Sequence, residues 1–179
     1  MSDEAKLHAG AAVSGDAEIV GDVTVMPRTC IHPKAVIIAT SGNPIFIGEG
    51  NIIEETARII STSGPVKIGN FNHMMVGSCI DSCSIGSANV LEPKSSVAAE
   101  CTIGDRCVVG ALVHVAKGTT VPDNTHISGS DNAHRQAEPS AANAAREVPQ
   151  VLEKELEILH REFNRLPAIK IRKPTVNAD

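Results

Sequence analysis

The chain has no tryptophan, no tyrosine and only three phenylalanines among its 179 residues. Proteins that bind single-stranded nucleic acid stack the bases on aromatic side chains, so this composition argues against that class. The formal net charge of −5 also argues against a broad nucleic-acid-binding surface. The sequence has no apolar run of about 18 residues and no signal peptide, which favours a soluble cytosolic protein that does not span a membrane.

Aliphatic side chains recur at every sixth position over most of the chain, a spacing that fits neither an amphipathic helix nor an alternating strand. A strict period of this kind indicates a repeat architecture, and the length indicates a single domain. The nineteen periodic sites fall into four runs: Val13, Ile19, Val25, Ile31 and Ile37; Ile47, Ile53 and Ile59; Ile68, Met74 and Ile80; Ile85, Leu91, Val97, Ile103, Val109, Val115, Val121 and Ile127.

The interruptions between the runs have the composition of turns. "TSGNP" at 40–44 separates the first two runs, and "STSGP" at 61–65 separates the second from the third. Gly, Pro, Ser and Asn clusters of this kind predict loops, which we place at corners of the repeat. The step from Ile80 to Ile85 is five residues, so one repeat unit is a residue short.

The pattern resembles the hexapeptide-repeat family, and the resemblance covers residues 8–130. It implies an all-β fold, a left-handed parallel β-helix in which three short strands per coil form a triangular prism. At about 18 residues per coil the nineteen sites give about six coils, stacked about 4.8 Å apart. The periodic side chains then form aliphatic columns inside the prism, where there is little room for aromatic rings.

Small residues precede many of the periodic sites by two positions, as a tight corner requires, and three of the five cysteines are among them. Cys83, Cys101 and Cys107 in this position are expected to act as compact apolar fillers. Cys83 and Cys101 lie one coil apart and could form a disulfide. The cytosolic context favours reduced thiols instead.

The hexads stop after Ile127, and a different pattern follows. Residues 131–148 are predicted to be a connector, residues 149–166 a C-terminal α-helix, and residues 167–179 a basic, flexible tail. The helix has an apolar stripe with steps of 4, 3, 4 and 3. This stripe could pack on a flank of the prism or bind a partner, and it consists of Leu152, Leu156, Leu159, Phe163 and Leu166.

Many hexapeptide-repeat proteins are acyltransferases, which need a histidine as general base beside a cleft between protomers. His32, His73 and His114 lie within the prism, and His114 is expected to face outward because it immediately precedes Val115. An exposed histidine needs no function, however, and both loops are short. We therefore expect no catalytic residue and no small-molecule substrate.

The stretch "IGNFNHMMVGSCIDSCSIG" at 68–86 resembles the metal-binding region of the γ-class carbonic anhydrases, including the short step before the last "IG". Without gaps, the two histidine positions of that family fall on Val76 and Asp81, and His73 is three residues too early. The first ligand would fall near Ile59 or Ile60. A catalytic zinc site needs three protein ligands, so we expect no metal and no cofactor.

Three further segments resemble the small hexapeptide subunits at the pointed end of dynactin. They are "PRTCIHPKA" at 27–35, "IGEGNIIEE" at 47–55 and "VPDNT" at 121–125. The resemblance implies a non-enzymatic scaffold in the cytoplasm, on the cytoskeleton, that supports dynein-driven transport and the engagement of cargo adaptors. The partners it implies are dynactin subunit 5, which is a second hexapeptide prism, and the other pointed-end subunits.

Overall fold

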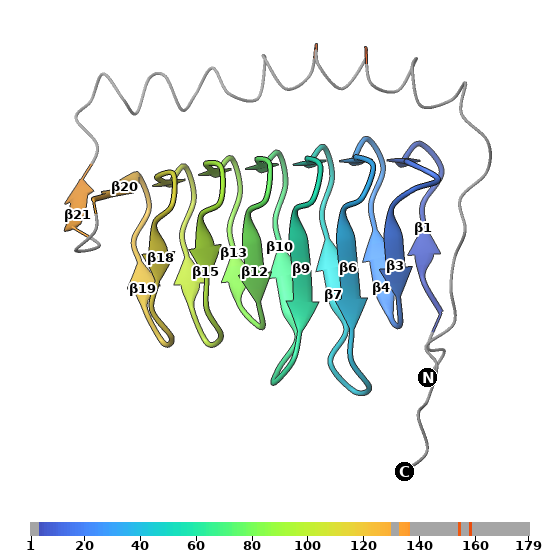
Figure 1. The fold of residues 1–179 in the computed structure, drawn as a ribbon, viewed down its shortest axis with the longest axis horizontal. Coiled ribbons are helices and arrows are strands. Elements are labelled where there is room, and N and C mark those ends of the chain that lie inside the picture. The colour runs from blue at the N-terminus through green and yellow to red at the C-terminus, as the bar shows by residue number, and fades with distance from the viewer. Residues whose placement is uncertain (1–3, 130–132, 137–153, 155–157, 159–179) are drawn as a thin grey trace.

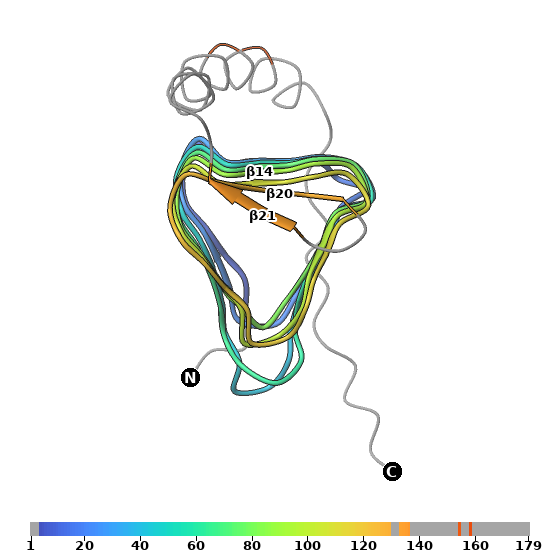
Figure 2. The same cartoon turned by 90° about the vertical axis from the view of Figure 1, so that its left-hand side faces the viewer.

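A computed structural model describes residues 4–129 and 133–136, together with Lys154 and Ile158. The described strands form three sheets whose strands run parallel except for the last (Figure 1). Seen along the stack, the sheets are the three walls of a triangular prism (Figure 2). The predicted parallel β-helix is therefore confirmed.

Each coil adds one strand to each wall. Sheet A consists of β1 (Lys6–Leu7), β4 (Val23–Val25), β7 (Ile45–Ile47), β10 (Val66–Ile68), β13 (Ser84–Ile85), β16 (Thr102–Ile103) and β19 (Thr120–Val121). Sheet B consists of β2 (Ala12–Val13), β5 (Cys30–Ile31), β8 (Ile52–Ile53), β11 (His73–Met74), β14 (Val90–Leu91), β17 (Val108–Val109), β20 (Thr125–Ser128) and β21 (Ala133–Gln136). Sheet C consists of β3 (Glu18–Val20), β6 (Val36–Ala39), β9 (Arg58–Ser61), β12 (Cys79–Asp81), β15 (Ser96–Val97) and β18 (His114–Val115).

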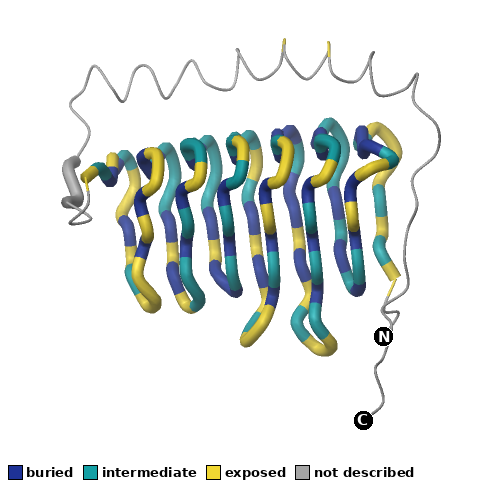
Figure 3. The backbone as a smooth tube through the Cα atoms, in the orientation of Figure 1, coloured by how far each residue is buried: buried dark blue, intermediate teal, exposed yellow. Residues whose placement is uncertain are grey.

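The periodic aliphatic side chains fill the inside of the prism. All nineteen predicted sites are buried, and none is more than 8% exposed. Equivalent residues of successive coils are direct partners, as in the register Ile85–Ile103–Val121 of sheet A. Figure 3 shows the resulting alternation of buried and more exposed positions along the strands.

The prism has about seven coils, one more than the sequence analysis predicts. The additional coil begins at β1, where Leu7 pairs with Val25. Leu7 lies six residues before Val13 and so continues the hexad register toward the N-terminus. Its side chain is only partly buried because no further coil covers it within the described residues.

All three irregular steps of the repeat lie at the corner between sheets C and A. The 40–44 loop connects β6 to β7 and the 61–65 segment leads from β9 to β10, and Figure 2 shows both loops projecting from one corner of the triangle. The short step falls in the next coil, where Ser82 turns between β12 and β13 with φ of 42°. Length changes are tolerated here because a corner, unlike a wall, has no strand register to preserve.

Beyond residue 130 the structure describes only a few positions. β21 lies within the predicted connector and pairs antiparallel with β20, so sheet B extends further than the predicted prism boundary. Lys154 and Ile158 have helical backbone, as the predicted helix requires. The rest of the predicted connector, helix and tail lies outside the described residues. In the described part of the chain, no helix has the length and hydrophobicity needed to cross a membrane.

Candidate functional site

The three histidines considered as catalytic bases lie at separate positions on the outside of the prism. His114 on β18 is exposed, as predicted, and its Nδ1 lies 2.8 Å from the hydroxyl oxygen of Ser96 in the preceding coil. His73 Nε2 lies 2.6 Å from Glu54 Oε1. Each of these rings therefore has a neighbour one coil away, and no described contact joins one histidine to another.

His32 is the third histidine, and its neighbour lies in the following coil, not in the preceding one. Its Nδ1 lies 3.2 Å from Glu55 Oε1. A backbone hydrogen bond at Glu55, together with this contact to His32, lowers the pKa of the Glu55 carboxyl. The charged form of Glu55 is therefore favoured, which suits an acceptor in an ion pair and not a general acid at neutral pH.

The positions that match the metal ligands of the γ-class carbonic anhydrases do not form a ligand set. Val76 is 41% exposed and has no donor atom in its side chain. Ile59 faces the core, and Ile60 lies opposite Asp81 in sheet C. Among the described residues, no group of three or more His, Cys, Asp or Glu side chains is placed to hold a metal ion.

Asp81 has a structural role at the corner with the loops. Its carboxylate accepts hydrogen bonds from the hydroxyl groups of Thr62 (2.8 Å) and Ser82 (2.6 Å) and from the backbone N–H of Thr62 (3.2 Å). Burial alone would raise the pKa of Asp81, but the bonds from Ser82 and Thr62 outweigh it and hold the pKa below the ordinary value. Asp81 thus fixes the 61–65 segment to the next coil.

The cysteines in the corner positions behave as the sequence analysis expects. Cys83, Cys101 and Cys107 are buried, and no disulfide joins Cys83 to Cys101. Burial raises the pKa of Cys83 to about 12. A thiol with so high a pKa is almost entirely protonated at neutral pH, so it is a poor nucleophile.

A buried polar ladder runs along the corner between sheets A and B, and the sequence analysis did not identify it. Asn51, Asn72 and Asn89 occupy the position two before a periodic site in three successive coils, and all are fully buried. Asn72 Nδ2 donates to Asn51 Oδ1 (3.0 Å) and to the Gly86 carbonyl (2.9 Å), and Asn72 Oδ1 accepts from the Asn89 N–H (2.9 Å). The recurrence of asparagine at this one hexad position was the signal in the sequence.

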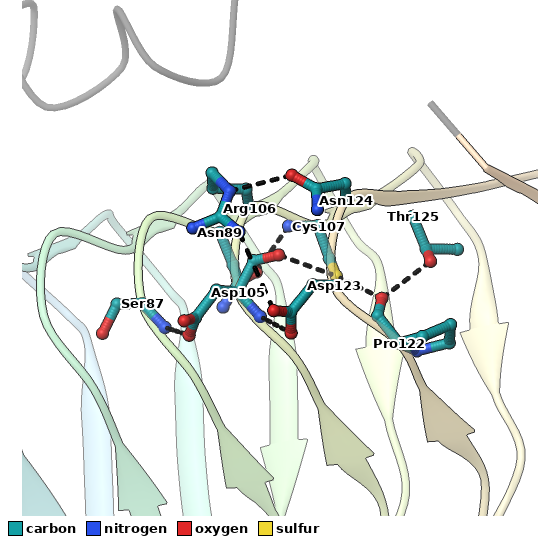
Figure 4. Close-up of polar contacts among 9 residues, drawn as sticks. All are labelled: Ser87, Asn89, Asp105, Arg106, Cys107, Pro122, Asp123, Asn124 and Thr125. Atoms are coloured by element: carbon teal, nitrogen blue, oxygen red, sulfur yellow. Dashed lines mark hydrogen bonds and ion pairs between the residues drawn. The ribbon is translucent and has the colours of Figure 1, made fainter. Parts of the chain in front are cut away.

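A second polar column at the same corner accounts for the glycines that follow the periodic residues. The Ser87 N–H donates to Asp105 Oδ1 (2.7 Å), and the Asp105 N–H donates to Asp123 Oδ1 (2.9 Å), as Figure 4 shows. A Cβ at Gly86 would lie only 2.3 Å from Asp105 Oδ1, and one at Gly104 equally close to Asp123 Oδ1. The glycines leave room for these carboxylates, whose function is to join coils.

Arg106 adds a side-chain link to this column. Its Nε donates to Asn124 Oδ1 at 2.8 Å, and its Nη2 lies 3.7 Å from Asp123 Oδ2 (Figure 4). The polar groups of this corner therefore bond to one another from coil to coil. Such an arrangement stabilises the stack, and nothing in it points to a bound substrate.

The geometry defines a class: a hexapeptide-repeat β-helix whose polar side chains at the corners join neighbouring coils. A candidate acetyltransferase from Bacillus cereus superposes with a TM-score of 0.82 at 19% identity, over 90% of this chain and 92% of that one. A hexapeptide transferase family protein from Anaplasma phagocytophilum gives 0.74 at 19% identity over the same shares. At this identity the likeness shows the left-handed β-helix fold alone.

Sequence relatives identify the family. The chain is 39% identical over 161 residues to dynactin subunit 6 of Nematostella vectensis, covering 83% of each chain. It is 39% identical to dynactin subunit 6 of Danio rerio over 73% of each chain, and 40% identical to that of Xenopus tropicalis over 73% of this chain and 70% of the relative. The chain belongs to the dynactin subunit 6 family. No model of a known protein family matches it.

Proposed function

We propose that the chain is a structural subunit of the pointed-end complex of dynactin and has no catalytic activity of its own. The observation that carries this proposal is the 39% identity to dynactin subunit 6 over 83% of both chains. The polar side chains of the prism support it, because the best candidates for chemistry, among them Asp81 and Asp105, are used to join neighbouring coils.

The proposed partners are dynactin subunit 5, as a second hexapeptide prism, and the other pointed-end subunits. In this role the chain acts in the cytoplasm, on the cytoskeleton, and supports dynein-driven transport and the engagement of cargo adaptors. A prism suits a scaffold because its hydrogen-bonded walls are rigid and its end strands offer edges to a neighbour.

Co-expression with dynactin subunit 5 tests the proposal. The two chains are expected to elute together from a size-exclusion column at a one-to-one ratio, while neither does so with an unrelated hexapeptide acyltransferase as a matched control. A correctly folded chain that elutes alone in the presence of subunit 5 would contradict the proposed pairing.

An acyltransferase is the second candidate, favoured by the fold neighbours and by the outward position of His114. An acyltransferase binds acyl-CoA, and binding to the folded state raises the melting temperature. We expect no thermal shift with acetyl-CoA or longer acyl-CoA, and no release of coenzyme A with amine or hydroxyl acceptors. Release of coenzyme A that is lost in His114→Ala, with the thermal shift retained, would establish the enzymatic alternative.

A further inference from the structure

Along each wall of the prism, backbone N–H groups of one coil donate to carbonyl groups of the next coil. On sheet C, one series of these donors has acceptors at 2.8–2.9 Å, and it consists of Glu18, Val36, Arg58, Cys79 and Ser96. His114 holds the next position in this series, and it lies on β18, the last strand of the sheet. Among the residues that the structure describes, the His114 N–H has no acceptor.

A second backbone donor at the end of β18 is in the same position. The Ala98 N–H donates to the Val115 carbonyl at 3.0 Å, and Ala116 is the equivalent of Ala98 in the last coil. In the described part of the chain, nothing accepts a hydrogen bond from the Ala116 N–H. His114 and Ala116 are two residues apart, which is the spacing of the groups that point to one side of a strand. The outer edge of β18 therefore presents two successive donors.

The other two walls do not offer such an edge at this end of the prism. On sheet B, β20 is paired with the antiparallel strand β21 (Figure 2). On sheet A, the Gly86 and Gly104 N–H groups each donate to the next coil, and the residue at this position in the last coil is Pro122. Because proline has no N–H, sheet A keeps only the donor of Thr120 here. A paired strand and a proline both block edge pairing in natural proteins, and within the described residues β18 has neither.

An exposed leucine lies next to this edge. Leu112, at the corner before β18, is 75% exposed and has φ of 62°, which is in the left-handed region. That backbone conformation is unfavourable for leucine and suits glycine or asparagine better. Two coils earlier the same corner position is Gly77. Neither the backbone nor the packing of the prism favours a leucine at this position, whereas a bound segment that covers its side chain would.

We propose that β18 is a docking edge for an extended segment of a partner protein, which adds to sheet C as a further parallel strand. The pairing of β15 with β18 gives the register. One carbonyl of the segment accepts from the His114 N–H, and the carbonyl two residues later accepts from the Ala116 N–H. The residue before the first of these acceptors lies beside Leu112, so it is aliphatic in a segment that fits.

The side chains that frame the edge favour an acidic segment. His114 points outward from β18 and Lys117 follows at the next corner, and both are exposed. Lys117 lies 2.9 Å from Glu100, but these side chains are 64% and 63% exposed, so the ion pair is weak. The residue between the two acceptors of the segment lies beside His114. A carboxylate at that position complements the basic frame.

A single segment fits this end of the prism better than a second folded prism does. Two prisms stacked end to end would pair strands on all three walls, and β21 and Pro122 oppose this pairing on two of them. Strand addition at β18 needs only one wall. This inference does not depend on the proposed function, because it follows from the backbone ladder of the last coil.

Selection from a peptide library tests the docking edge. Random peptides displayed on phage are selected against the full-length chain, and the enriched peptides are synthesised. We expect them to carry an aliphatic residue followed two positions later by Asp or Glu, and to slow hydrogen exchange of the His114 and Ala116 amides in NMR spectra. Ala116→Pro copies onto sheet C the proline that sheet A has at the same hexad position. It should weaken peptide binding at least about fivefold, because one backbone donor is lost.

A second variant separates binding from folding, in case Ala116→Pro unfolds the last coil. Leu112→Asn should be at least as stable as the unmodified chain, because asparagine tolerates the left-handed region, and yet should bind the selected peptides at least about threefold more weakly. The matched control Thr102→Ala, at an exposed position of sheet A, should leave binding unchanged.

Three results would overturn the proposal. They are a selection without enrichment, protection confined to amides outside β18, and unchanged affinity for Leu112→Asn and for a folded Ala116→Pro. Co-elution with subunit 5 is measured on the same variants, so a failure of the docking edge is distinct from a failure of the proposed function. If Ala116→Pro loses subunit 5 and no peptide is enriched, the edge binds a folded prism, which also contradicts the proposal.

Discussion

At the scale of single residues, buried asparagines hold one corner of the prism together. The side chain of Asn72 bonds to the coil before it through Asn51 and to the coil after it through Gly86 and Asn89. Buried amide groups are usually hydrogen-bonded. The Asn51 and Asn72 side chains bond to each other, and Asn89 Oδ1 accepts from the Cys107 N–H, whereas Asn89 Nδ2 has no partner among the described residues. The ladder is a source of stability that the aliphatic columns do not provide.

Replacing Asn72 by alanine should therefore destabilise the chain. The variant leaves buried groups of Gly86 and Asn89 without a partner, which costs about 1–3 kcal/mol. Urea denaturation followed by circular dichroism measures the loss. The control Thr102→Ala, at an exposed position on β16, is expected to change the free energy of unfolding by less than about 0.5 kcal/mol. Equal effects of the two changes would contradict a specific role for the ladder.

Two glycines with similar backbone angles allow steric crowding to be separated from backbone strain. Gly21 has φ of 83° and Gly42 has φ of 80°. A Cβ at Gly21 would lie 2.2 Å from the carbonyl oxygen of Ala39, whereas one at Gly42 would meet nothing within 4 Å.

Both alanine variants should incur the cost of the left-handed conformation, about 1–2 kcal/mol. Gly21→Ala should lose about 1–3 kcal/mol more, because the added methyl group is forced against the next coil. Parallel denaturation curves of the two variants give the difference. If Gly42→Ala is as unstable as Gly21→Ala, the close stacking of coils at this corner is not what requires glycine.

At the scale of the strand, the two sides of a wall have different roles. Ile59 and Ile60 are neighbours on β9, but Ile59 is fully buried in the core and Ile60 lies partly exposed on the outside of sheet C. Both residues are isoleucine, so a difference in the stability lost when each is replaced by alanine reports the effect of position alone.

Ile59→Ala should cost about 2–5 kcal/mol, since it leaves a cavity in a column whose neighbours are fixed by the sheet register. Ile60→Ala should cost less than about 1.5 kcal/mol, because less apolar surface is lost from burial. Thermal and urea unfolding of both variants provide the comparison. A similar cost at both positions would show that the aliphatic column does not dominate the stability of the coil.

The 61–65 segment is an element whose attachment depends on pH. The pKa of Asp81 in the folded chain lies below its ordinary value of 3.8. The ionised form of Asp81 therefore stabilises the folded chain at pH values above 3.8. This stabilisation is lost as the pH falls through the lower pKa of the folded state. Asp81→Asn should remove this contribution and flatten the acid limb of the stability curve between about pH 5 and pH 2. Denaturation curves at a series of pH values test this. An acid limb identical to that of the unmodified chain would argue against it.

The strand pattern could be predicted from the sequence because each inward position needs an aliphatic side chain of similar size. Leu7 fits the same register, yet it stands before the first run and its coil was not counted. The asparagine ladder was missed because asparagine is also common in turns, and one sequence does not show whether its amide is buried. β21 could not be predicted because the hexads end at Ile127 and an antiparallel return strand has no such period.

For the candidate site, the sequence predicted which way single side chains point but did not predict their contacts with other coils. The outward position of His114 followed from strand alternation, and the sequence alone shows that Val76 and the isoleucines at the matched positions have no donor atoms. The role of Asp81 did not follow, because its partners Thr62 and Ser82 come from a different coil and from the short step. Contacts between coils depend on which residues of neighbouring coils lie side by side. The residue types at a corner do not specify this alignment.

At the scale of the whole molecule, the prism is a rigid body whose walls and corners differ. Its periodic aliphatic residues face inward, and asparagines and aspartates at its corners join neighbouring coils. A molecule of this kind offers flat faces to neighbouring subunits, and among its described residues no group of three or more His, Cys, Asp or Glu side chains is placed to hold a metal ion. These features suit the proposed place in the pointed-end complex.

Purification of the tagged, full-length chain from its native cell, with quantitative mass spectrometry of the bound proteins, tests the central proposal most directly. We predict that the pointed-end subunits of dynactin, with subunit 5 at a ratio close to one, are recovered together with the dynactin filament. Recovery of a correctly folded chain without any dynactin subunit would contradict the account.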